Sequence, residues 1–263
     1  MTVKNGGRYL REAVDSIRAQ DMTDWEAVIV DDGSADDTPA YLERLPSEDS
    51  RFRVKLTSGV GRGTALNIAV SMCRADILTN LDADDLAHPQ RARVLVEVMG
   101  QYPEFVVITG RSQLATNYSV PEWISGRQVV ADVADVTPRL AHANPVGHSS
   151  VGIRRSAMEV VDGYDEKRSS QFDYDLWVRL ALEGYRLGGI DATLGAKRSH
   201  KGQSYERSAH LRYASRSALV QWRAVRGLGV NRFFGAIRIG ARIVWACVPV
   251  KGRMWARRQG FLK

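Results

Sequence analysis

The chain is poor in cysteine and lacks the sequence signals of several protein classes. Cys73 and Cys247 are its only cysteines, and neither belongs to a Cys-x-x-Cys pattern, so no disulfide framework or zinc site is indicated. No run of 18 apolar residues is present, so the sequence predicts no transmembrane helix. The N-terminus does not join a basic start to an apolar run, which argues against secretion. We expect a cytoplasmic protein in a reducing compartment.

Acidic residues are absent from the C-terminal part of the chain. From Arg207 to Lys263 there are 13 Lys and Arg and no Asp or Glu, whereas 24 basic and 30 acidic residues precede Arg207. The net charge of +7 therefore combines a mildly acidic main portion with a strongly basic tail. Such a tail favours an anionic surface as its partner, either a membrane or a nucleic acid.

Short apolar runs alternate with helical patterns in the N-terminal half of the chain. The apolar runs predict strands at 26–30, 53–56, 77–81 and 105–109, and helical spacing of apolar residues separates them. This alternation predicts an α/β fold with a mostly parallel sheet and helices on both faces. Ligands of such folds bind at the carboxyl ends of the strands.

An acidic cluster follows one of these expected strands. Asp82 and Asp84 come directly after the strand at 77–81, close enough to share one hard cation. Mg²⁺ or Mn²⁺ prefers a few carboxylate oxygens together with substrate phosphates, so the pair suits a metal–diphosphate site. The alternative is that Asp84 or Asp85 caps the following helix.

A second acidic pair follows the strand at 26–30. Asp31 and Asp32 repeat the arrangement, and turn or cap chemistry would explain this pair on its own. Because both clusters follow strands of one expected sheet, we predict that they face the same crevice.

Taken in order, several segments resemble the family-2 glycosyltransferases with the GT-A fold. The segments are Asn5-Gly6-Gly7-Arg8-Tyr9-Leu10, Val30-Asp31-Asp32-Gly33-Ser34, Gly63-Thr64-Ala65-Leu66-Asn67, Leu81-Asp82-Ala83-Asp84-Asp85, His148-Ser149-Ser150-Val151, Gly163-Tyr164-Asp165 and Asp173-Tyr174-Asp175-Leu176-Trp177. The likeness runs from Met1 to about Ser204, and several separate motifs in the right order make it specific.

The resemblance implies an inverting transfer of a sugar from a nucleotide-diphosphate sugar, UDP-linked, to an acceptor hydroxyl, in cell-surface polysaccharide biosynthesis. Asp31, Asp32, Asn67 and Asp82 would then bind the donor, with Asp32 at its base. Asp82 and Asp84 would hold a Mn²⁺ or Mg²⁺ ion, which neutralises the leaving diphosphate.

Inversion also needs a general base on the face of the sugar opposite the leaving group. The resemblance assigns this role to Asp173. Phe172 stands where the family usually has Glu, so the local acceptor contacts differ from the family pattern. The alternative for Asp173 is a helix N-cap.

Two histidines complete the implied site. His148 would bind substrate on the acceptor side, and His200 would reach the metal or the diphosphate. Each has a plainer interpretation, since His148 could be a hydrogen-bonded structural residue and His200 a solvated loop residue.

The resemblance also implies a division of the chain. We expect a GT-A domain at 1–206, with a nucleotide-sugar-binding half at 1–110 and an acceptor-binding half at 111–206, followed by a basic helical extension at 207–263. The family begins with a full hydrophobic strand, whereas only three residues precede Lys4 here. Either the first strand is short or the native start lies upstream.

The basic extension contains one conspicuous apolar segment. Residues 233–248 combine apolar side chains with Arg238 and Arg242 at helical spacing. Such a helix could lie in the headgroup region of an anionic membrane, as a peripheral contact on the inner face. A terminal helix packed on the catalytic core or on a second subunit is the alternative.

Two other functions stay open on the sequence. A metal-dependent nucleotidyltransferase acting on a sugar phosphate could use the same carboxylates and would release pyrophosphate. A nucleic-acid binder would leave both acidic clusters without a role, so we expect no nucleic-acid partner. The acceptors compatible with the family are glycans, lipid-linked sugars and small molecules.

Overall fold

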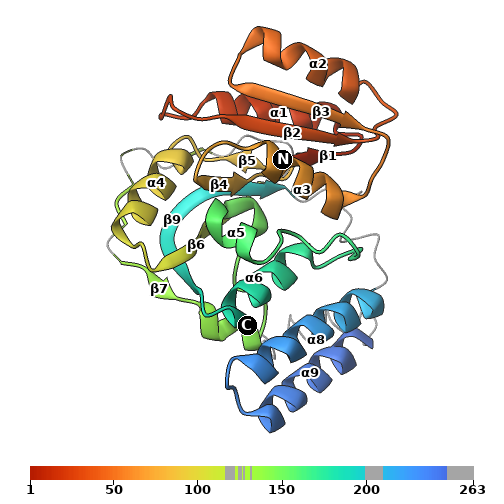
Figure 1. The fold of residues 1–263 in the computed structure, drawn as a ribbon, viewed down its shortest axis with the longest axis vertical. Helices are drawn as coiled ribbons and strands as arrows, with labels where there is room; N and C mark the ends of the chain where they lie inside the picture. Colours follow the sequence, from red (N-terminus) through yellow and green to blue (C-terminus); the bar gives the residue numbers. More distant parts are fainter. Residues whose placement is uncertain (116–121, 124–125, 127, 131, 199–209, 248–263) are drawn as a thin grey trace.

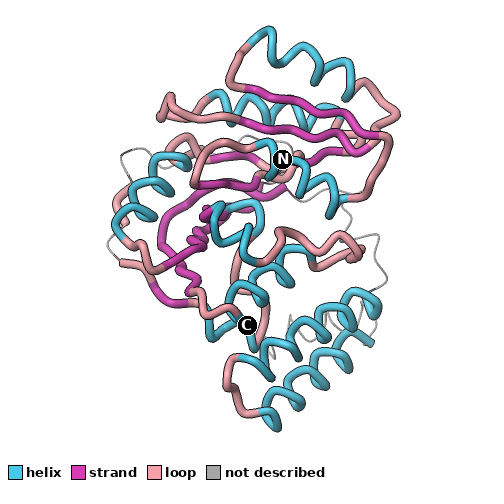
Figure 2. The backbone as a smooth tube through the Cα atoms, in the orientation of Figure 1, coloured by secondary structure: helices cyan, strands magenta, loops and turns pink. Residues whose placement is uncertain are grey.

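Two β-sheets and a helical hairpin make up the computed structural model, which describes residues 1–115, 122–123, 126, 128–130, 132–198 and 210–247 (Figures 1 and 2). The first sheet is parallel, with the strand order β1-β2-β3. Its strands are β1 (Thr2–Val3), β2 (Ala27–Asp32) and β3 (Phe52–Thr57). The strands predicted at 26–30 and 53–56 correspond to β2 and β3.

Helices cover both faces of this sheet because the side chains of β2 alternate between the faces. Ile29 packs with α1 and α2 on one face, whereas Val28 and Val30 pack with α3 on the other. The helices are α1 (Gly7–Arg18), α2 (Thr38–Glu48) and α3 (Arg62–Met72). Burial on both faces explains why β2 is a continuous apolar run in the sequence.

The second sheet is mixed rather than mostly parallel. Its order is β4-β8-β6-β9-β5, with β7 paired to β9 at the side, and among the strands described only β6 and β9 run parallel. The strands are β4 (Ile77–Asn80), β5 (Leu86–Ala87), β6 (Phe105–Ala115), β7 (Ala134–Asp135), β8 (Val151–Arg154) and β9 (Arg186–Arg198). The α/β class is confirmed. The first sheet is parallel as predicted, and the second is mixed because β8 lies between β4 and β6 in the opposite direction.

The second sheet is packed by helices that include the two largest fully buried side chains, Trp177 and Tyr174. They are α4 (Arg91–Gln101), α5 (Arg155–Val160), α6 (Phe172–Leu182) and the 3₁₀ turns η1 (Thr137–Ala141) and η2 (His148–Ser150). Tyr174, Leu176, Trp177 and Leu180 of α6 are fully buried. This burial fixes α6 and therefore the position of its first turn, which contains Asp173.

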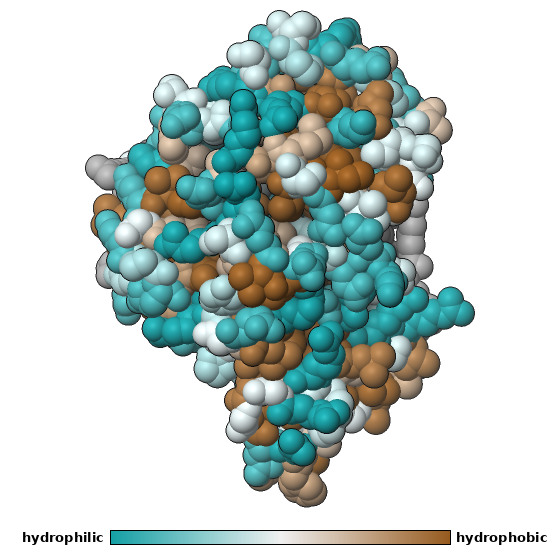
Figure 3. All heavy atoms as spheres, in the orientation of Figure 1, coloured by the Kyte–Doolittle hydropathy of each residue, from teal (hydrophilic) through white to brown (hydrophobic). Residues whose placement is uncertain are grey.

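A hairpin of two helices, α8 (His210–Gly227) and α9 (Arg232–Cys247), ends the described chain (Figure 1). Val220, Ala224 and Val225 of α8 belong to the same buried cluster as α6. The helix α9 packs mainly on α8. Where the hairpin lies, hydrophobic side chains are mixed with hydrophilic ones on the surface (Figure 3). Within the described residues, no helix is both long and apolar enough to cross a bilayer.

The first strand is short, and a cavity lies beside it. β1 has two residues and pairs only with β2 among the described strands. An apolar cavity of about 680 Å³ lies between β2 and β4, lined in part by Val28, Leu66 and Leu78. The N-terminal ammonium donates to the Val28 carbonyl, 2.9 Å away, at the end of this cavity.

Candidate active site

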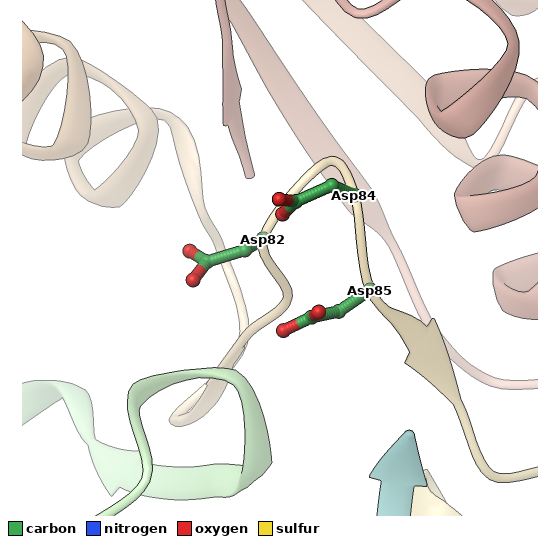
Figure 4. Close-up of side chains that lie close together, drawn as sticks. All are labelled: Asp82, Asp84 and Asp85. Atoms are coloured by element: carbon green, nitrogen blue, oxygen red, sulfur yellow. The ribbon is translucent and has the colours of Figure 1, made fainter. Parts of the chain in front are cut away.

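Three carboxylates gather in the turn between β4 and β5 (Figure 4). One oxygen from each of Asp82, Asp84 and Asp85 lies within 4.8 Å of the others. The backbone of the turn is held by two hydrogen bonds. The N–H of Asp85 donates to the Asp82 carbonyl at 3.0 Å, and the N–H of Asp82 donates to Ser149 Oγ at 2.9 Å. The turn therefore presents all three carboxylates to one point.

Asp85 is the most deeply buried of the three, at 2% exposure. Its Oδ1 accepts the backbone N–H of Arg198 at 3.1 Å, whereas its Oδ2 is buried and has no hydrogen-bond partner among the described residues. Burial, followed by the charge of Asp82, raises the pKa of Asp85 to about 7. A buried oxygen without a partner is destabilising, and a hard divalent cation would satisfy it. The carboxylate set therefore fits Mg²⁺ or Mn²⁺.

The structure also rules out the capping interpretation of these acids. The helix that follows, α4, begins at Arg91 with Gln90 as its N-cap, so neither Asp84 nor Asp85 caps it. Asp85 was not predicted as a metal ligand. Its signal was present in the sequence as a third acid in the same turn, but its burial depends on Arg198, which is far along the chain.

Asp82 is held by Arg62, Asn80 and His148. Arg62 Nη2 donates to Asp82 Oδ1 at 2.7 Å, Asn80 Nδ2 lies 3.3 Å from the same oxygen, and His148 Nδ1 lies 3.7 Å from it. Burial opposes ionisation of Asp82, but the Arg62 charge and these neighbours outweigh it and hold the pKa of Asp82 far below its usual range. Asp82 is therefore a carboxylate at neutral pH.

His148 connects the acidic turn to a segment from the second half of the chain. Its Nδ1 lies 3.1 Å from Asn80 Nδ2 and its Nε2 lies 2.9 Å from Tyr164 Oη. An amide nitrogen can only donate, so in the tautomer that satisfies both contacts Nδ1 accepts from Asn80 and Nε2–H donates to Tyr164. His148 thus lies beside Asp82, and both of its ring nitrogens have hydrogen-bond partners.

Asp173 lies in the first turn of α6, and its Oδ2 accepts Asn144 Nδ2 at 2.8 Å. Gln171, with a φ of 60°, is the N-cap of α6, so Asp173 is not the helix cap. The charge of Asp82 is the main cause of the raised pKa of Arg62, partial desolvation opposes it, and the charges of Asp173 and Asp84 also raise it. The guanidinium of Arg62 therefore lies within the electrostatic influence of all three acids.

The two acidic clusters are joined through the glycine-rich loop before α3. Asp32 Oδ1 accepts the Gly61 N–H at 3.0 Å, and the next residue, Arg62, contacts Asp82. Gly61 has a φ of 91°, a conformation that glycine adopts without strain. The strands β2 and β4 belong to different sheets, so the two clusters do not follow strands of one sheet as expected, and the Gly61–Arg62 segment is what connects Asp32 to Asp82. Asp31 instead closes its own turn, accepting the N–H of Ser34 at 3.0 Å and the Ser34 hydroxyl.

Asn67 has its side-chain amide occupied by protein contacts. Its Oδ1 accepts the Tyr164 N–H at 2.8 Å, and its Nδ2 donates to the Tyr164 carbonyl and to Glu166, each at 2.9 Å. Asn67 therefore ties α3 to the segment that carries Tyr164. His200, predicted as a metal ligand, lies outside the described residues.

A buried arginine that was not predicted from the sequence, Arg91, stabilises the backbone around this site. Arg91 is 2% exposed and donates to the carbonyls of Ser149, at 2.5 Å, and Asn80. Burial lowers the pKa of Arg91 to about 10. It therefore holds together the two segments that contact Asp82. As a lone Arg in a helical pattern, it gave no signal that it would be buried.

Comparison with known proteins assigns the chain to a family. Residues 1–155 match the sequence model described as glycosyl transferase family 2. The chain belongs to this family. An uncharacterized glycosyltransferase of Haemophilus influenzae is 26% identical over 252 residues, which cover 92% of this chain and 91% of the relative. The amylovoran biosynthesis glycosyltransferase AmsE of Erwinia amylovora is 24% identical over 226 residues, 83% of this chain and 84% of the relative.

Solved structures of glycosyltransferases share the fold. The complex of residues 1–349 of S. aureus TarS with UDP-GlcNAc superposes with a TM-score of 0.70 at 16% identity, covering 92% of this chain and 70% of that one. The mannosyltransferase PcManGT of Pyrobaculum calidifontis, in complex with GDP-Man and Mn²⁺, gives 0.63 at 16% identity, covering 98% and 77%. The family-2 member described here is a glycosyltransferase with the GT-A fold, and both predictions are confirmed.

Proposed function

We propose that this enzyme is an inverting glycosyltransferase that moves a sugar from a UDP-linked donor to an acceptor hydroxyl with the help of a divalent cation. The observation that carries the proposal is the convergence of Asp82, Asp84 and Asp85 within 4.8 Å, together with the buried, unpartnered Oδ2 of Asp85. These three carboxylates would hold Mn²⁺ or Mg²⁺, with His200 retained as a predicted further ligand. When bound, the ion neutralises charge on the departing diphosphate.

Arg62 supports the same step from the protein side. Its guanidinium contacts Asp82 and is partly exposed, so it has further N–H groups to offer to an anionic ligand beside the carboxylates. Charge-assisted hydrogen bonds of this kind orient a diphosphate and stabilise the charge that develops on it. The paired cation also keeps Asp82 ionised and ready to bind a metal.

The acceptor proton would go to Asp173. Its carboxylate is held by Asn144 on one oxygen, and α6 is locked by its buried face, so the base has a fixed position. Phe172, which precedes it, packs against the core, so this position offers no carboxylate to the acceptor.

The remaining predicted residues fit the donor side in two ways. Asp32 reaches the loop at Gly61 and would contact the base, whereas Asp31 shapes the turn that positions Asp32. Asn67 and His148 both hold Tyr164 and would shape the pocket through it.

The amylovoran relative supports a role in making cell-surface polysaccharide, with a glycan, lipid-linked sugar or small molecule as acceptor. A peripheral contact of the basic tail with an anionic membrane on the cytoplasmic side is part of this proposal.

A donor screen tests the proposal. Purified enzyme with Mn²⁺ is mixed with UDP-, GDP- and dTDP-sugars, and the melting temperature is measured; a ligand at a hundred times its Kd adds roughly 2.7 kcal/mol of stability. Product analysis then follows. We expect release of an intact nucleoside diphosphate, whereas release of pyrophosphate from a nucleoside triphosphate and a sugar phosphate would show a nucleotidyltransferase instead.

A further inference from the structure

The helix α9 has an apolar side directed away from the protein. Its exposed large apolar side chains are Phe233 at 70%, Phe234 at 59%, Ile237 at 52% and Val244 at 66%. With 3.6 residues per turn, these four lie within an arc of about 120°. We call them the α9 face. Gly240 and Ala241, which are also exposed, fall within the same arc, so no charged side chain interrupts it.

The opposite side of α9 makes the contacts that hold it to the protein, and it contains the arginines. Gly235 is buried so close to α8 that an added Cβ would lie 2.5 Å from Val225 Cγ1. Arg242 donates to Gln221 Oε1 at 3.1 Å and to Ser217 Oγ at 2.6 Å, and Arg238 Nη1 lies 2.6 Å from His142 Nδ1. The sequence pattern placed Arg238 and Arg242 among possible headgroup contacts. The structure instead directs them to protein partners.

The helix α9 therefore has apolar side chains on two sides: Ile239 packs against the core, whereas the α9 face lies outward, where an ordinary surface helix is polar. Reversing α9 about its axis would bury the phenylalanines, but it would lose the close approach at Gly235 and the arginine contacts. An apolar stripe kept outward by specific contacts indicates an apolar partner. Phe233 and Phe234 meet edge to face, with ring centroids 5.7 Å apart, and form the broadest part of the stripe.

The charge around the α9 face selects the partner. Arg226 and Arg232 are exposed at the connection between the two helices, and Arg232 directly precedes Phe233. No Asp or Glu occurs from Arg207 to the end of the chain. We propose that the α9 face docks the enzyme on an anionic lipid bilayer, with its apolar side chains in the interface and these arginines at the headgroups.

A second copy of the chain fits the same face less well. An isologous contact of α9 with α9 would bring two arginine-rich hairpins together, and neither hairpin has a carboxylate to pair with the other. An anionic bilayer supplies both an apolar layer and negative charge. Docking in this manner would also favour an acceptor carried by a lipid. The docking rests on and deepens the membrane contact proposed above for the basic tail, whereas the lipid-carried acceptor also depends on the proposed glycosyl transfer.

Vesicle sedimentation with the full chain tests the docking. We compare phosphatidylcholine vesicles with vesicles that also contain phosphatidylglycerol, and the wild type is expected to sediment with the anionic ones. The double variant Phe233→Ser/Phe234→Ser should lower the partition coefficient by at least about tenfold. Arg232→Gln should lower binding to the anionic vesicles by about fivefold, since each juxtaposed cation contributes on that order.

A matched control removes two apolar side chains elsewhere. Leu114 is 67% exposed on β6 and Val160 is 56% exposed on α5, so Leu114→Ser/Val160→Ser changes a similar exposed area without touching the hairpin. It should bind vesicles like the wild type. Unchanged thermal unfolding of all variants verifies that they fold.

Three results would overturn the docking. One is a wild-type chain that fails to sediment with anionic vesicles, and another is equal loss of binding in the control. The third is a lipid-free dimer, seen by sedimentation equilibrium, that the phenylalanine variant converts to monomer, because the face would then bind a second copy. The assay needs no turnover, so its failure leaves the glycosyl-transfer proposal untouched.

Discussion

At the end of β2, Asp31 accepts hydrogen bonds from both the backbone N–H and the hydroxyl of Ser34, whereas in the turn after β4 one oxygen of Asp85 is buried without a partner among the described residues. Both acidic clusters lie at the C-terminal end of a buried strand. They differ in the supply of local donors. The first turn satisfies its leading carboxylate internally, and the second leaves three carboxylates directed at one point. Donor supply, rather than the number of acids, therefore distinguishes a structural turn from a candidate ligand site.

The largest effect expected from this comparison is on the second turn. Asp82→Ala/Asp84→Ala removes two of the three converging carboxylates and should lower the rate of glycosyl transfer by at least about 10³-fold, because charge on the leaving diphosphate is no longer neutralised. Steady-state release of nucleoside diphosphate measures it. The matched control is Asp76→Asn, an exposed acid just before β4, which should stay within about twofold of the wild type. Equal losses in both variants would contradict the assignment.

Asp173 tests whether the site includes an acid from the second half of the chain. Asp173→Asn keeps the contact with Asn144 in reach but removes the proton acceptor, so kcat should fall by about 10²-fold. Donor affinity, measured by calorimetry in the absence of acceptor, should change little. A variant with normal kcat would remove Asp173 from the mechanism.

The two acids at the end of β2 should affect different properties: Asp31 the stability of the protein and Asp32 the binding of the donor. Asp31→Ala leaves the Ser34 donors without their acceptor and should lower the free energy of unfolding by roughly 1–3 kcal/mol. Asp32→Ala should instead weaken donor binding, by about tenfold, with a smaller loss of stability. Urea unfolding and calorimetric titration with the donor nucleotide check the two outcomes. If the two variants showed the same pattern, the proposed difference between these residues would be wrong.

Glu26, the residue before β2, allows the effect of donor supply on a carboxylate to be tested through the pH dependence of stability. Its Oε1 accepts the N–H groups of Arg74, at 2.5 Å, and Ala75, at 3.1 Å. Burial opposes ionisation, but these donors prevail and lower the pKa of Glu26 from 4.5. Its stabilising effect is therefore fully present above pH 4.5 and is lost as the pH falls through the lowered folded-state pKa.

Glu26→Gln should accordingly destabilise the protein by about 1 kcal/mol at pH 7. The difference from the wild type should shrink below pH 4, as measured by urea unfolding at both values. Glu43→Gln, an exposed acid on α2, is the control and should show no such dependence. A Glu26 penalty that is independent of pH would mean that its packing, not its charge, matters.

The strands of the N-terminal half and the family could be predicted from the sequence. The runs at 26–30, 53–56, 77–81 and 105–109 correspond to β2, β3, β4 and β6, because strands buried in a core are continuous apolar runs. The acids at the C-terminal ends of β2 and β4 could also be located from the sequence, because each apolar run stops where the acids begin. β8 and β9 were not predicted, because the glycine- and threonine-containing segment around β9 lacks a strand periodicity.

Only the tertiary structure decided which residues meet at the acidic turn and which side of α9 faces outward. Arg62, Asn80, His148 and Tyr164 come from four separate segments, and their contacts depend on packing between α3, β4 and the second half of the chain. Helical periodicity shows that α9 has an apolar side, but periodicity is the same whichever way the helix is turned. Contacts between distant segments set that direction, and a pattern of neighbouring residues does not contain them.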